Sequence, residues 1–543
     1  MHRFLHVDEI LRILTYELVA SEAKATAVAL ACCCRSFEEP VLDGLWETQY
    51  RLTPLLKCFP RDIWKEEDGH FVSPPTTFIP PVFNRSIWES FKRVPTKAEW
   101  VYSRKYARRM RRLKVDTSED PITSDILLVL QLRAANDPWL PRLKTFICEE
   151  VKEAFIPFIP FFLSPRTIRI KIGFTENSPM VVIASMIASF STLCPDLECI
   201  ILFGMPGDPV ITSAVSELLL GCNRDILQTF QVDSPLTEEA REVLYRLPRL
   251  SDLWAVIQGP ASLPTVALPN LTTIDLEYGD HLDWLQRFRG ATFEKLEEVT
   301  LRSESQQTGD FLGSFESVVL TTSAQNTLSK LNFHTSRPWS PNYSSLLSFK
   351  QLKELVIEFS CNGGCSSMVD DNVIIDLARA MPKLEVLQLG RAPCRFLTGI
   401  TVNGLINLTC RCPQLSKLRI HFQATSLVDA STSAATRFLS GDEPIVRRKD
   451  CALSDLEVGA IPFPAGSAST IALILLQIFP RILNVRYFSR EWEAVAEMIK
   501  EFRRLGVFVG RSGKVHPSHL VVFSDVSPAD AIDVGRSAED SQV

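Results

Sequence analysis

A nine-residue phrase recurs along most of this chain and constrains its fold more than any other feature. The clearest copies carry proline at the second position and leucine or isoleucine at the fourth, seventh and ninth, and they read LPNLTTIDL at 268–276, MPKLEVLQL at 381–389 and CPQLSKLRI at 412–420. One copy would be an ordinary turn before a strand. A series at roughly constant spacing indicates structural units stacked on one another, and such stacks commonly present an extended binding surface.

The first leucine of each phrase marks one unit. Clear markers are Leu143, Leu197, Leu250, Leu271, Leu296, Leu328, Leu352, Leu384, Leu415 and Leu453, and weaker ones are Ile168, Leu227 and Ile482. The steps range from 21 residues (250 to 271) to 38 residues (415 to 453), which spans and exceeds the length of about 20–29 residues for leucine-rich repeats. The position after the strand, which holds asparagine in regular leucine-rich repeats, varies here. We therefore predict an irregular leucine-rich-repeat array with uneven curvature.

Each unit is expected to contain a helix, a proline-marked turn and a short strand. The apolar positions of the phrase alternate, as they do in a strand with one buried face. Residues 181–193 and 373–381 have helical spacing, and Pro195 and Pro382 follow them. The predicted fold class is an α/β solenoid. The alternative is an α/β domain with one long parallel sheet, which would need longer and more uniformly apolar strands.

The first fifty residues do not share the repeat. Three short helices are expected there, the second of them alanine-rich at 24–34, and such a small module barely buries a core. It should therefore leave an apolar face for a partner. The apolar residues of the first helix are Phe4, Val7, Ile10, Leu11, Leu14 and Leu18, and those that close the module are Phe37, Pro40, Leu42, Leu45 and Trp46.

The same residues resemble a known family. The segment DEILRIL at 8–14 resembles the opening helix of an F-box, CRSF at 34–37 resembles its middle signature, and LW at 45–46 matches its closing pair. Two positions depart from the family: His-Val at 6–7 stands where Leu-Pro is usual, and Phe37 stands where Trp is commoner.

The layout of the whole chain extends the resemblance. CPDL at 194–197 and CPQL at 412–415 resemble the cysteine-containing repeats of F-box proteins, and the chain is similar to the expanded F-box families of mushroom-forming fungi. This resemblance implies binding to a Skp-type adaptor and, through it, to a cullin-based ubiquitin ligase. It assigns adaptor binding to Ile10, Leu11, Leu14, Phe37, Leu45 and Trp46.

Strand residues between the apolar positions should line the open face of the array. Its middle is predicted to be acidic and its later part basic, and the candidate target-binding residues are Trp254, Asp275, Glu277, Glu298, Lys417 and Arg419. A mixed surface suits a protein or peptide, whereas nucleic acid favours a continuous basic track, and the net charge of -6 agrees. The alternative is that these are ordinary solvated strand residues.

The resulting hypothesis is a non-enzymatic substrate-recognition adaptor of a Skp-cullin-F-box type ubiquitin ligase. The array would hold an unknown target protein and raise its local concentration for partner enzymes. The alternative is a protein-interaction scaffold with no ubiquitin-ligase link, whose N-terminal helices only cap the array. An enzyme is not expected, because neither a phosphate-binding glycine loop nor a G-x-S-x-G elbow is present.

Neither a metal nor a cofactor is expected. Cys361 and Cys365 flank an Asn-Gly-Gly loop, and Cys410 and Cys412 have the wrong spacing for the other half of a zinc site. No secretory signal opens the chain, and apolar runs such as 471–476 are far shorter than the about 20 residues that span a bilayer. We expect a cytoplasmic or nuclear protein whose 14 cysteines are reduced core residues.

Four regions are predicted. Residues 1–50 form the F-box-like helical module, 51–116 a proline-rich connector and a basic helix, 117–505 the solenoid, and 506–543 a largely disordered tail. The basic helix, at 97–114, would present a solvated face at the start of the array, and a nuclear-localisation or nucleic-acid role is the alternative. Its arginines include Arg108, Arg109, Arg111 and Arg112.

Overall fold

The computed structural model describes residues 8–21, 23–33, 35–66, 88–117, 122–134, 138–175, 178–205, 207–257, 268–278, 293–303, 323–335, 343–359, 369–390, 399–425, 451–459, 463–464 and 466–504. The predicted tail at 506–543, residues 67–87 of the proline-rich connector, and the pair Cys361 and Cys365 lie outside these residues. The chain forms an N-terminal unit of Met1–Met368 and Asp376–Cys394, and a C-terminal unit of Val369–Ile375 and Arg395–Val543.

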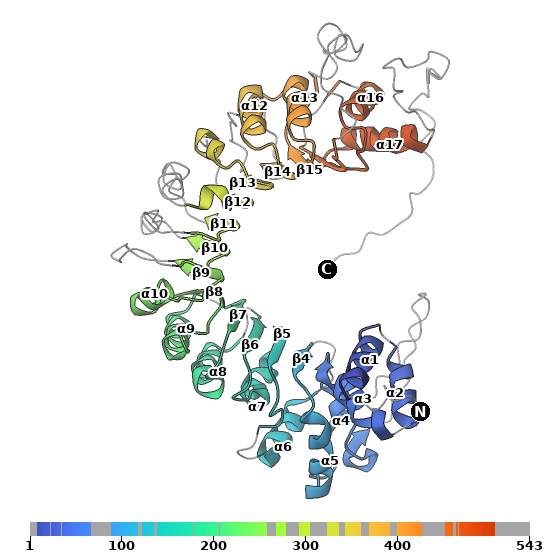
Figure 1. Cartoon of the computed structure of the whole chain (residues 1–543), viewed down its shortest axis with the longest axis vertical. Helices are drawn as coiled ribbons and strands as arrows, with labels where there is room; N and C mark the ends of the chain where they lie inside the picture. The colour runs from blue at the N-terminus through green and yellow to red at the C-terminus, as the bar shows by residue number, and fades with distance from the viewer. Residues whose placement is uncertain are drawn as a thin grey trace, which may run out of the picture. The chain divides into compact units, whose positions relative to one another are not determined.

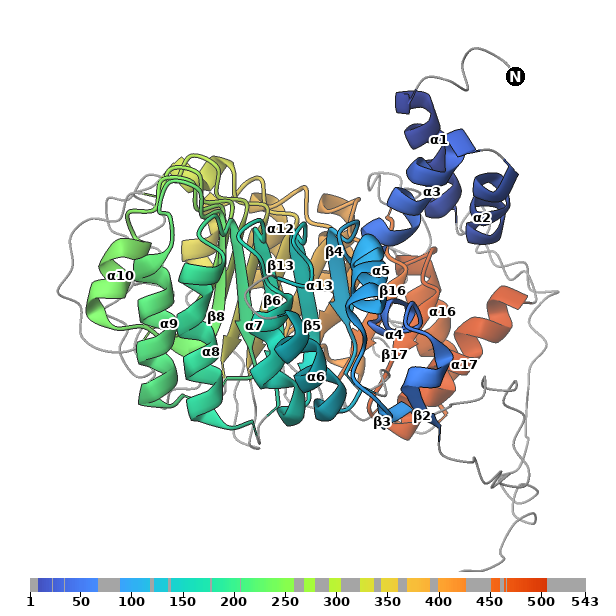
Figure 2. The ribbon, with the colours of Figure 1, turned by 90° about the horizontal axis from the view of Figure 1, so that it is seen from below.

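A parallel sheet runs through the N-terminal unit, and its strands follow one another in chain order (Figure 1). Within this unit Figures 1 and 2 show the strands side by side, with helices α6 to α9 packed against one of their faces. This is the α/β solenoid-like arrangement that the repeat predicts. The strands are β1 (Thr48–Gln49), β4 (Arg112–Val115), β5 (Thr145–Val151), β6 (Arg169–Phe174), β7 (Cys199–Phe203), β8 (Thr229–Pro235), β9 (Asp252–Ile257), β10 (Thr273–Tyr278), β11 (Glu298–Ser303), β12 (Lys330–Thr335), β13 (Glu354–Phe359) and β14 (Val386–Leu389).

Buried marker residues fix where these strands begin. Leu143, Leu250 and Leu352 each lie two residues before a strand, and all three are fully buried. Inside the strands the apolar positions are buried as well, for example Ile274 and Leu276 in β10. Burying one such side chain contributes roughly 1.5–3 kcal/mol, so a slip of one residue, which would turn every apolar side chain to the opposite face, is strongly disfavoured.

One weak marker is displaced by a residue. The sequence pattern points to Ile168, whereas the pairing of Arg169 with Thr145 places Thr167 opposite Leu143. Thr167 is fully buried, and its Oγ1 donates a hydrogen bond to the Leu143 carbonyl oxygen at 3.1 Å. A hydroxyl bonded to the backbone therefore replaces leucine, which a hydrophobic pattern cannot reveal.

Helices return the chain between strands in this unit. Asp208 shows why one of them begins where it does, since its side chain accepts a hydrogen bond from the Val210 N–H while Pro209 opens the first turn. The helix predicted at 181–193 is present. The described return segments before β12 and β13 are only short 3-10 helices, which is less than the helix predicted in every unit. The elements are α4 (Thr53–Leu56), η2 (Arg61–Ile63), α5 (Lys97–Ala107), α6 (Ser124–Ala134), η3 (Glu153–Phe158), α7 (Ile159–Phe162), α8 (Met180–Leu193), α9 (Pro209–Gly221), α10 (Glu238–Leu244), η5 (Ser323–Asn326), η6 (Tyr343–Ser348), and an antiparallel pair, β2 (Trp64–Glu66) with β3 (Trp88–Phe91).

The sheet begins before residue 117, which corrects the predicted boundary of the array. β1 pairs in parallel with β4, and Thr48 lies opposite Arg112. Met110, two residues before β4, is fully buried and occupies the marker position. The repeat pattern misses this unit because methionine replaces leucine in a window rich in basic residues.

The basic helix is shorter than predicted. α5 begins with a capping box, in which the side chains of Thr96 and Glu99 each accept a hydrogen bond from the other residue's backbone N–H. It ends at Ala107, and the residues expected to continue it enter β4. Arg109, in the intervening turn, has only 9% of its side chain exposed, so it is not part of a solvated face.

The N-terminal module consists of α1 (Asp8–Ala20), α2 (Lys24–Cys33) and α3 (Arg35–Glu47). Its core is small, as expected for three short helices. The core residues are Leu11, Ala27, Phe37 and Val41, and Leu18, Val19, Leu30, Ala31 and Leu45 pack around them.

The C-terminal unit has the same alternation of strand and helix. Its strands β15 (Lys417–Ile420), β16 (Asp455–Val458) and β17 (Asn484–Arg486) pair in parallel. Its helices are α13 (Val402–Arg411), α16 (Ala468–Ile478) and α17 (Arg490–Arg504), and α12 (Asp371–Ala380) has residues in both units. The predicted markers Leu415 and Leu453 are fully buried here.

Several cysteines are small core residues, in agreement with the sequence-based expectation. Burial raises the thiol pKa of Cys148, Cys194, Cys222 and Cys412 to about 12 in each case. These thiols are therefore protonated and unreactive near neutral pH.

Candidate functional site

The first candidate surface is the exposed face of the strands in the N-terminal unit. The first, third and fifth residues of each strand point to this face, because the second and fourth are buried. The parallel register aligns these residues in rows that cross the sheet. From β8 to β14 the middle row consists of Gln231, Trp254, Asp275, Thr300, Asn332, Val356 and Gln388.

Between β4 and β7 one carboxylate on this face is paired with two lysines. Glu149 accepts a hydrogen bond from Lys171 at 3.0 Å and lies 3.1 Å from Lys114. Both lysines lower the pKa of Glu149, with Lys171 contributing most. Lys171 also lies 5.8 Å from the centre of the Phe203 ring. The carboxylate of Glu149 is thus paired inside the protein.

A different arrangement surrounds Trp254 on β9. The guanidinium of Arg302, on β11, lies 5.7 Å from the centre of the Trp254 ring, and its Nη2 is 2.8 Å from Asp275 Oδ2. On the next strands, Asn332 Nδ2 donates a hydrogen bond to Thr300 Oγ1 at 3.2 Å. We call these five residues the Trp254 cluster.

Three buried polar atoms of the Trp254 cluster have no hydrogen-bond partner: Trp254 Nε1, Asp275 Oδ1 and Asn332 Oδ1. An unsatisfied buried group costs about 1–3 kcal/mol, so each needs an explanation. Burial also raises the pKa of Asp275 above its ordinary value, although Arg302 opposes this shift. The cluster therefore holds hydrogen-bonding capacity that the protein itself does not use.

An ion pair and a histidine–carboxylate contact flank the cluster. Lys330 Nζ lies 3.3 Å from Glu298 Oε2, and His334 Nδ1 lies 3.0 Å from Glu358 Oε2. Four of the predicted target-binding residues come together on these adjacent strands: Trp254, Asp275, Glu277 and Glu298.

Carboxylates accompany the basic residues in the later part of the array, which the sequence-based expectation of a basic surface did not include. In the C-terminal unit Arg419 Nε lies 2.8 Å from Glu457 Oε1, and Lys417 stands opposite Asp455 in the strand register. The two basic residues of β15 thus each face a carboxylate on β16. The sequence pattern of one strand cannot show this, because the pairing partner is supplied by the next unit.

The second candidate surface lies on the N-terminal module. Ile13 and Tyr16 of α1 are 64% and 63% exposed, and Leu14 between them is 42% exposed. Of the predicted adaptor-binding residues, Leu11 and Phe37 lie in the module core, Ile10, Leu45 and Trp46 are half-buried, and Leu14 is exposed. Leu11 and Phe37 can therefore support such a surface through the fold of the module.

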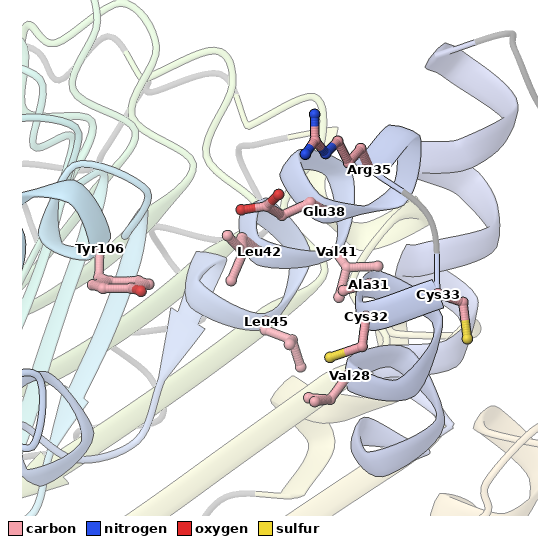
Figure 3. A pocket seen from close by; sticks show the side chains of 10 residues that line it. All are labelled: Val28, Ala31, Cys32, Cys33, Arg35, Glu38, Val41, Leu42, Leu45 and Tyr106. Carbon is pink, nitrogen blue, oxygen red and sulfur yellow. The ribbon is translucent and has the colours of Figure 1, made fainter.

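A groove of about 510 Å³ lies between the module and α5 (Figure 3). Tyr106 of α5 faces it from one side, while its ring centre is 5.0 Å from that of Trp46. A hydrogen bond with Tyr102 raises the pKa of Tyr106 to about 12. The other lining residues come from α2 and α3: Val28, Ala31, Cys32, Cys33, Arg35, Glu38, Val41, Leu42 and Leu45.

Arg109 fastens the module to the first strands of the sheet. Its guanidinium pairs with Glu39 and Asp43 of α3, and the backbone N–H of Arg111 donates to the Glu47 carbonyl oxygen at 2.9 Å. The sequence interpretation misses this role because the carboxylates lie 66 and 70 residues from Arg109 along the chain. Only the pairing of β1 with β4 brings them together.

The residues that the structure describes offer neither a metal-binding group nor a membrane-spanning helix. Within them, no three His, Cys, Asp or Glu side chains are grouped so as to hold a metal ion. No helix in those ranges combines the length and apolar character needed to cross a bilayer. Cys361 and Cys365, considered for zinc from the sequence, lie outside them.

Comparison with known proteins does not identify a family. No family model matches the chain, and no curated protein matches it significantly. Among solved structures, a Bacteroides fragilis protein from a structural genomics project is 13% identical with a TM-score of 0.27. The match covers 46% of this chain and 65% of that one, which is less than two thirds of its length. A similarity of this size carries no argument about fold or function.

Proposed function

We propose that this chain is a non-enzymatic substrate-recognition adaptor of a Skp-cullin-F-box type ubiquitin ligase. The N-terminal module would bind the Skp-type adaptor, and the strand face of the array would bind a target protein. The F-box resemblance of the first fifty residues motivates the link to ubiquitin. The observation that best supports a two-ended adaptor is the firm attachment of the module to the sheet.

This attachment uses three kinds of contact. Strand β1 continues directly from α3 and pairs with β4, Arg109 is held by two carboxylates of α3, and Trp46 packs on Tyr106. A partner on the module and a target on the first strands would therefore be held at a defined separation. Such positioning raises the effective concentration of the target at a bound enzyme, which is what a ligase adaptor must supply.

The exposed side chains of α1 supply the expected adaptor contact. Ile13, Leu14 and Tyr16 project from a module whose own core contains few residues. Aromatic and aliphatic side chains of this kind commonly dominate the affinity of an interface, and truncating one costs about 2 kcal/mol or more.

A binding measurement with a purified Skp-type adaptor tests the proposal. The full chain should bind it, and Ile13→Asp and Leu14→Asp should each weaken binding at least tenfold, because a carboxylate would be buried in an apolar contact. Val181→Asp, at a 69% exposed position of α8, is the matched control and should leave binding unchanged. Absence of binding by the unmodified chain would exclude the ligase role.

A protein-interaction scaffold without a ubiquitin link is the second candidate. The same contacts favour it, because α3 and β1 cover the edge of β4, and an open sheet edge is a liability that proteins commonly cap. In that case the strand face would still bind a target, while the adaptor would not bind.

A further inference from the structure

Arg302 occupies an unusual position within the Trp254 cluster. It lies over the Trp254 ring and against Asp275, yet 40% of its side chain remains exposed. Beside it, Trp254 Nε1 and Asp275 Oδ1 are inaccessible to solvent and have no partner. The guanidinium is thus held by an aromatic face and one carboxylate oxygen, while the second oxygen stays unused.

A second carboxylate occupies a nearer register position on the sheet. The register places Glu277 of β10 directly opposite Arg302, whereas Asp275 is the diagonal neighbour. Neighbouring strands lie about 4.7–4.9 Å apart and alternate residues along a strand about 6.6–6.8 Å apart, so the backbone of Glu277 is nearer to that of Arg302 than the backbone of Asp275 is. Arg302 therefore has an alternative acidic neighbour within reach if it leaves Asp275.

We propose that Trp254 and Asp275 form a binding site for a lysine or arginine side chain of a basic target segment, and that Arg302 occupies this site in the free protein. The incoming cation replaces Arg302 over the ring and at the carboxylate, and Arg302 moves to Glu277. The exchange substitutes one cation for another and gives Asp275 Oδ1 a donor. This inference rests on that part of the proposed function which gives the array a protein ligand.

The charge of the surrounding strands selects a basic ligand. At the positions of β8 to β13 that face outward, seven carboxylates stand against two side chains that are always cationic; they are Asp233, Asp252, Asp275, Glu277, Glu298, Glu354 and Glu358 against Arg302 and Lys330. An acidic peptide or a nucleic acid would be repelled by this balance. A basic segment is attracted by it, and one of its side chains would reach the aromatic ring.

The floor of this surface suits an extended segment that crosses the strands. Asn332 Oδ1 has no partner among the described residues, and Gln388 is 7% exposed. These amide side chains lie along the middle row, where they would meet the backbone N–H and C=O groups of such a segment.

Fluorescence anisotropy with two labelled nonapeptides tests the inference on the full chain. One peptide carries arginine at its third, fifth and seventh positions in a Gly-Ser background, and the other carries glutamate there. The arginine peptide should bind and the glutamate peptide should not. Trp254→Ala and Asp275→Asn should each weaken binding about tenfold, whereas Arg302→Gln should strengthen it at least threefold by removing the internal competitor.

Two controls separate this exchange from general charge attraction. Lys330→Gln changes the net charge as Arg302→Gln does, and Asp376→Asn on α12 changes it as Asp275→Asn does. Both should leave the affinity within about twofold of the unmodified chain. Weaker or unchanged binding by Arg302→Gln, equal effects of the controls, or preference for the glutamate peptide would each overturn the inference. No ligase adaptor is present in this measurement, so its failure is distinct from failure of the ligase proposal.

Discussion

Two stretches of the same exposed strand face use their polar groups in opposite ways. From β4 to β7, Lys114 and Lys171 share the carboxylate of Glu149. From β9 to β12, Asp275 and Asn332 keep buried oxygen atoms without partners. Both stretches are built of parallel strands, but the register shifts after Cys148 in β5, next to Glu149, and runs without a shift from β9 to β12. A repeat fold can thus pair a carboxylate on one stretch of its surface and leave oxygen atoms without hydrogen-bond partners on another.

The largest expected effect tests whether both stretches rest on the same packed core. Leu202→Ala in β7 and Leu331→Ala in β12 each remove a fully buried side chain. Each should lower the free energy of unfolding by about 2–5 kcal/mol, since a cavity is left in a close-packed interior. Urea midpoints followed by circular dichroism measure this loss. A much smaller loss for Leu331→Ala would show that the open stretch is loosely packed, and its unpaired atoms would then need no ligand.

A smaller change in stability is expected when Asn332 is replaced. Its side chain has one polar atom with a hydrogen bond and one without. Asn332→Val removes the unsatisfied acceptor and places a β-branched residue in a strand, so stability should stay unchanged or rise by about 1 kcal/mol. The same urea titration detects it. A loss of stability would mean that Asn332 is fully used in the free protein, and the contrast between the stretches would weaken.

Neutralising one carboxylate in each stretch should give effects of opposite sign. Glu149→Gln breaks a partly exposed pair and should cost about 0.2–1 kcal/mol, the usual range for surface ion pairs. Asp275→Asn removes a charge that burial disfavours, so it should leave stability unchanged or raise it. Thermal unfolding of the two variants at neutral pH provides the comparison. If the two variants lost stability to the same extent, Asp275 would be an ion-pair partner of the same kind as Glu149.

The sequence predicts the buried strand positions of this fold far better than the side-chain pairs on its surface. Markers such as Leu250 and Leu352 locate strands because burial of alternate residues is a local property of the chain. The sheet begins earlier than predicted, because methionine replaces leucine at the marker position Met110. What sequence reasoning cannot supply is pairing between units, since Arg109 with Glu39 and Arg302 with Asp275 join residues far apart along the chain.

The candidate site shows the same limit. Trp254 and Asp275 stand out in the sequence as an aromatic and an acidic residue at outward strand positions. Arg302 does not, because it follows the last apolar position of its phrase and nothing local ties it to a tryptophan two strands away. Equally, the sequence does not show that Lys417 stands opposite Asp455 and that Arg419 lies against Glu457.

The smallest effect is in the pH dependence of stability, where the two stretches should again differ in sign. Burial raises the pKa of Asp275 in the folded chain above the unfolded value of 3.8, so between these values the folded state binds more protons. The contribution of Asp275 to stability is therefore full below pH 3.8 and is lost as pH rises through the folded pKa. The lysines lower the pKa of Glu149 below its unfolded value of 4.5, so its contribution is present above pH 4.5 and is lost as pH falls through the folded pKa. With rising pH, Asp275→Asn should gain stability relative to the unmodified chain, while Glu149→Gln should lose it. Urea midpoints of the three proteins from about pH 3.5 to about pH 7 give the two difference curves, and slopes of equal sign would contradict the assignment of one paired and one desolvated carboxylate.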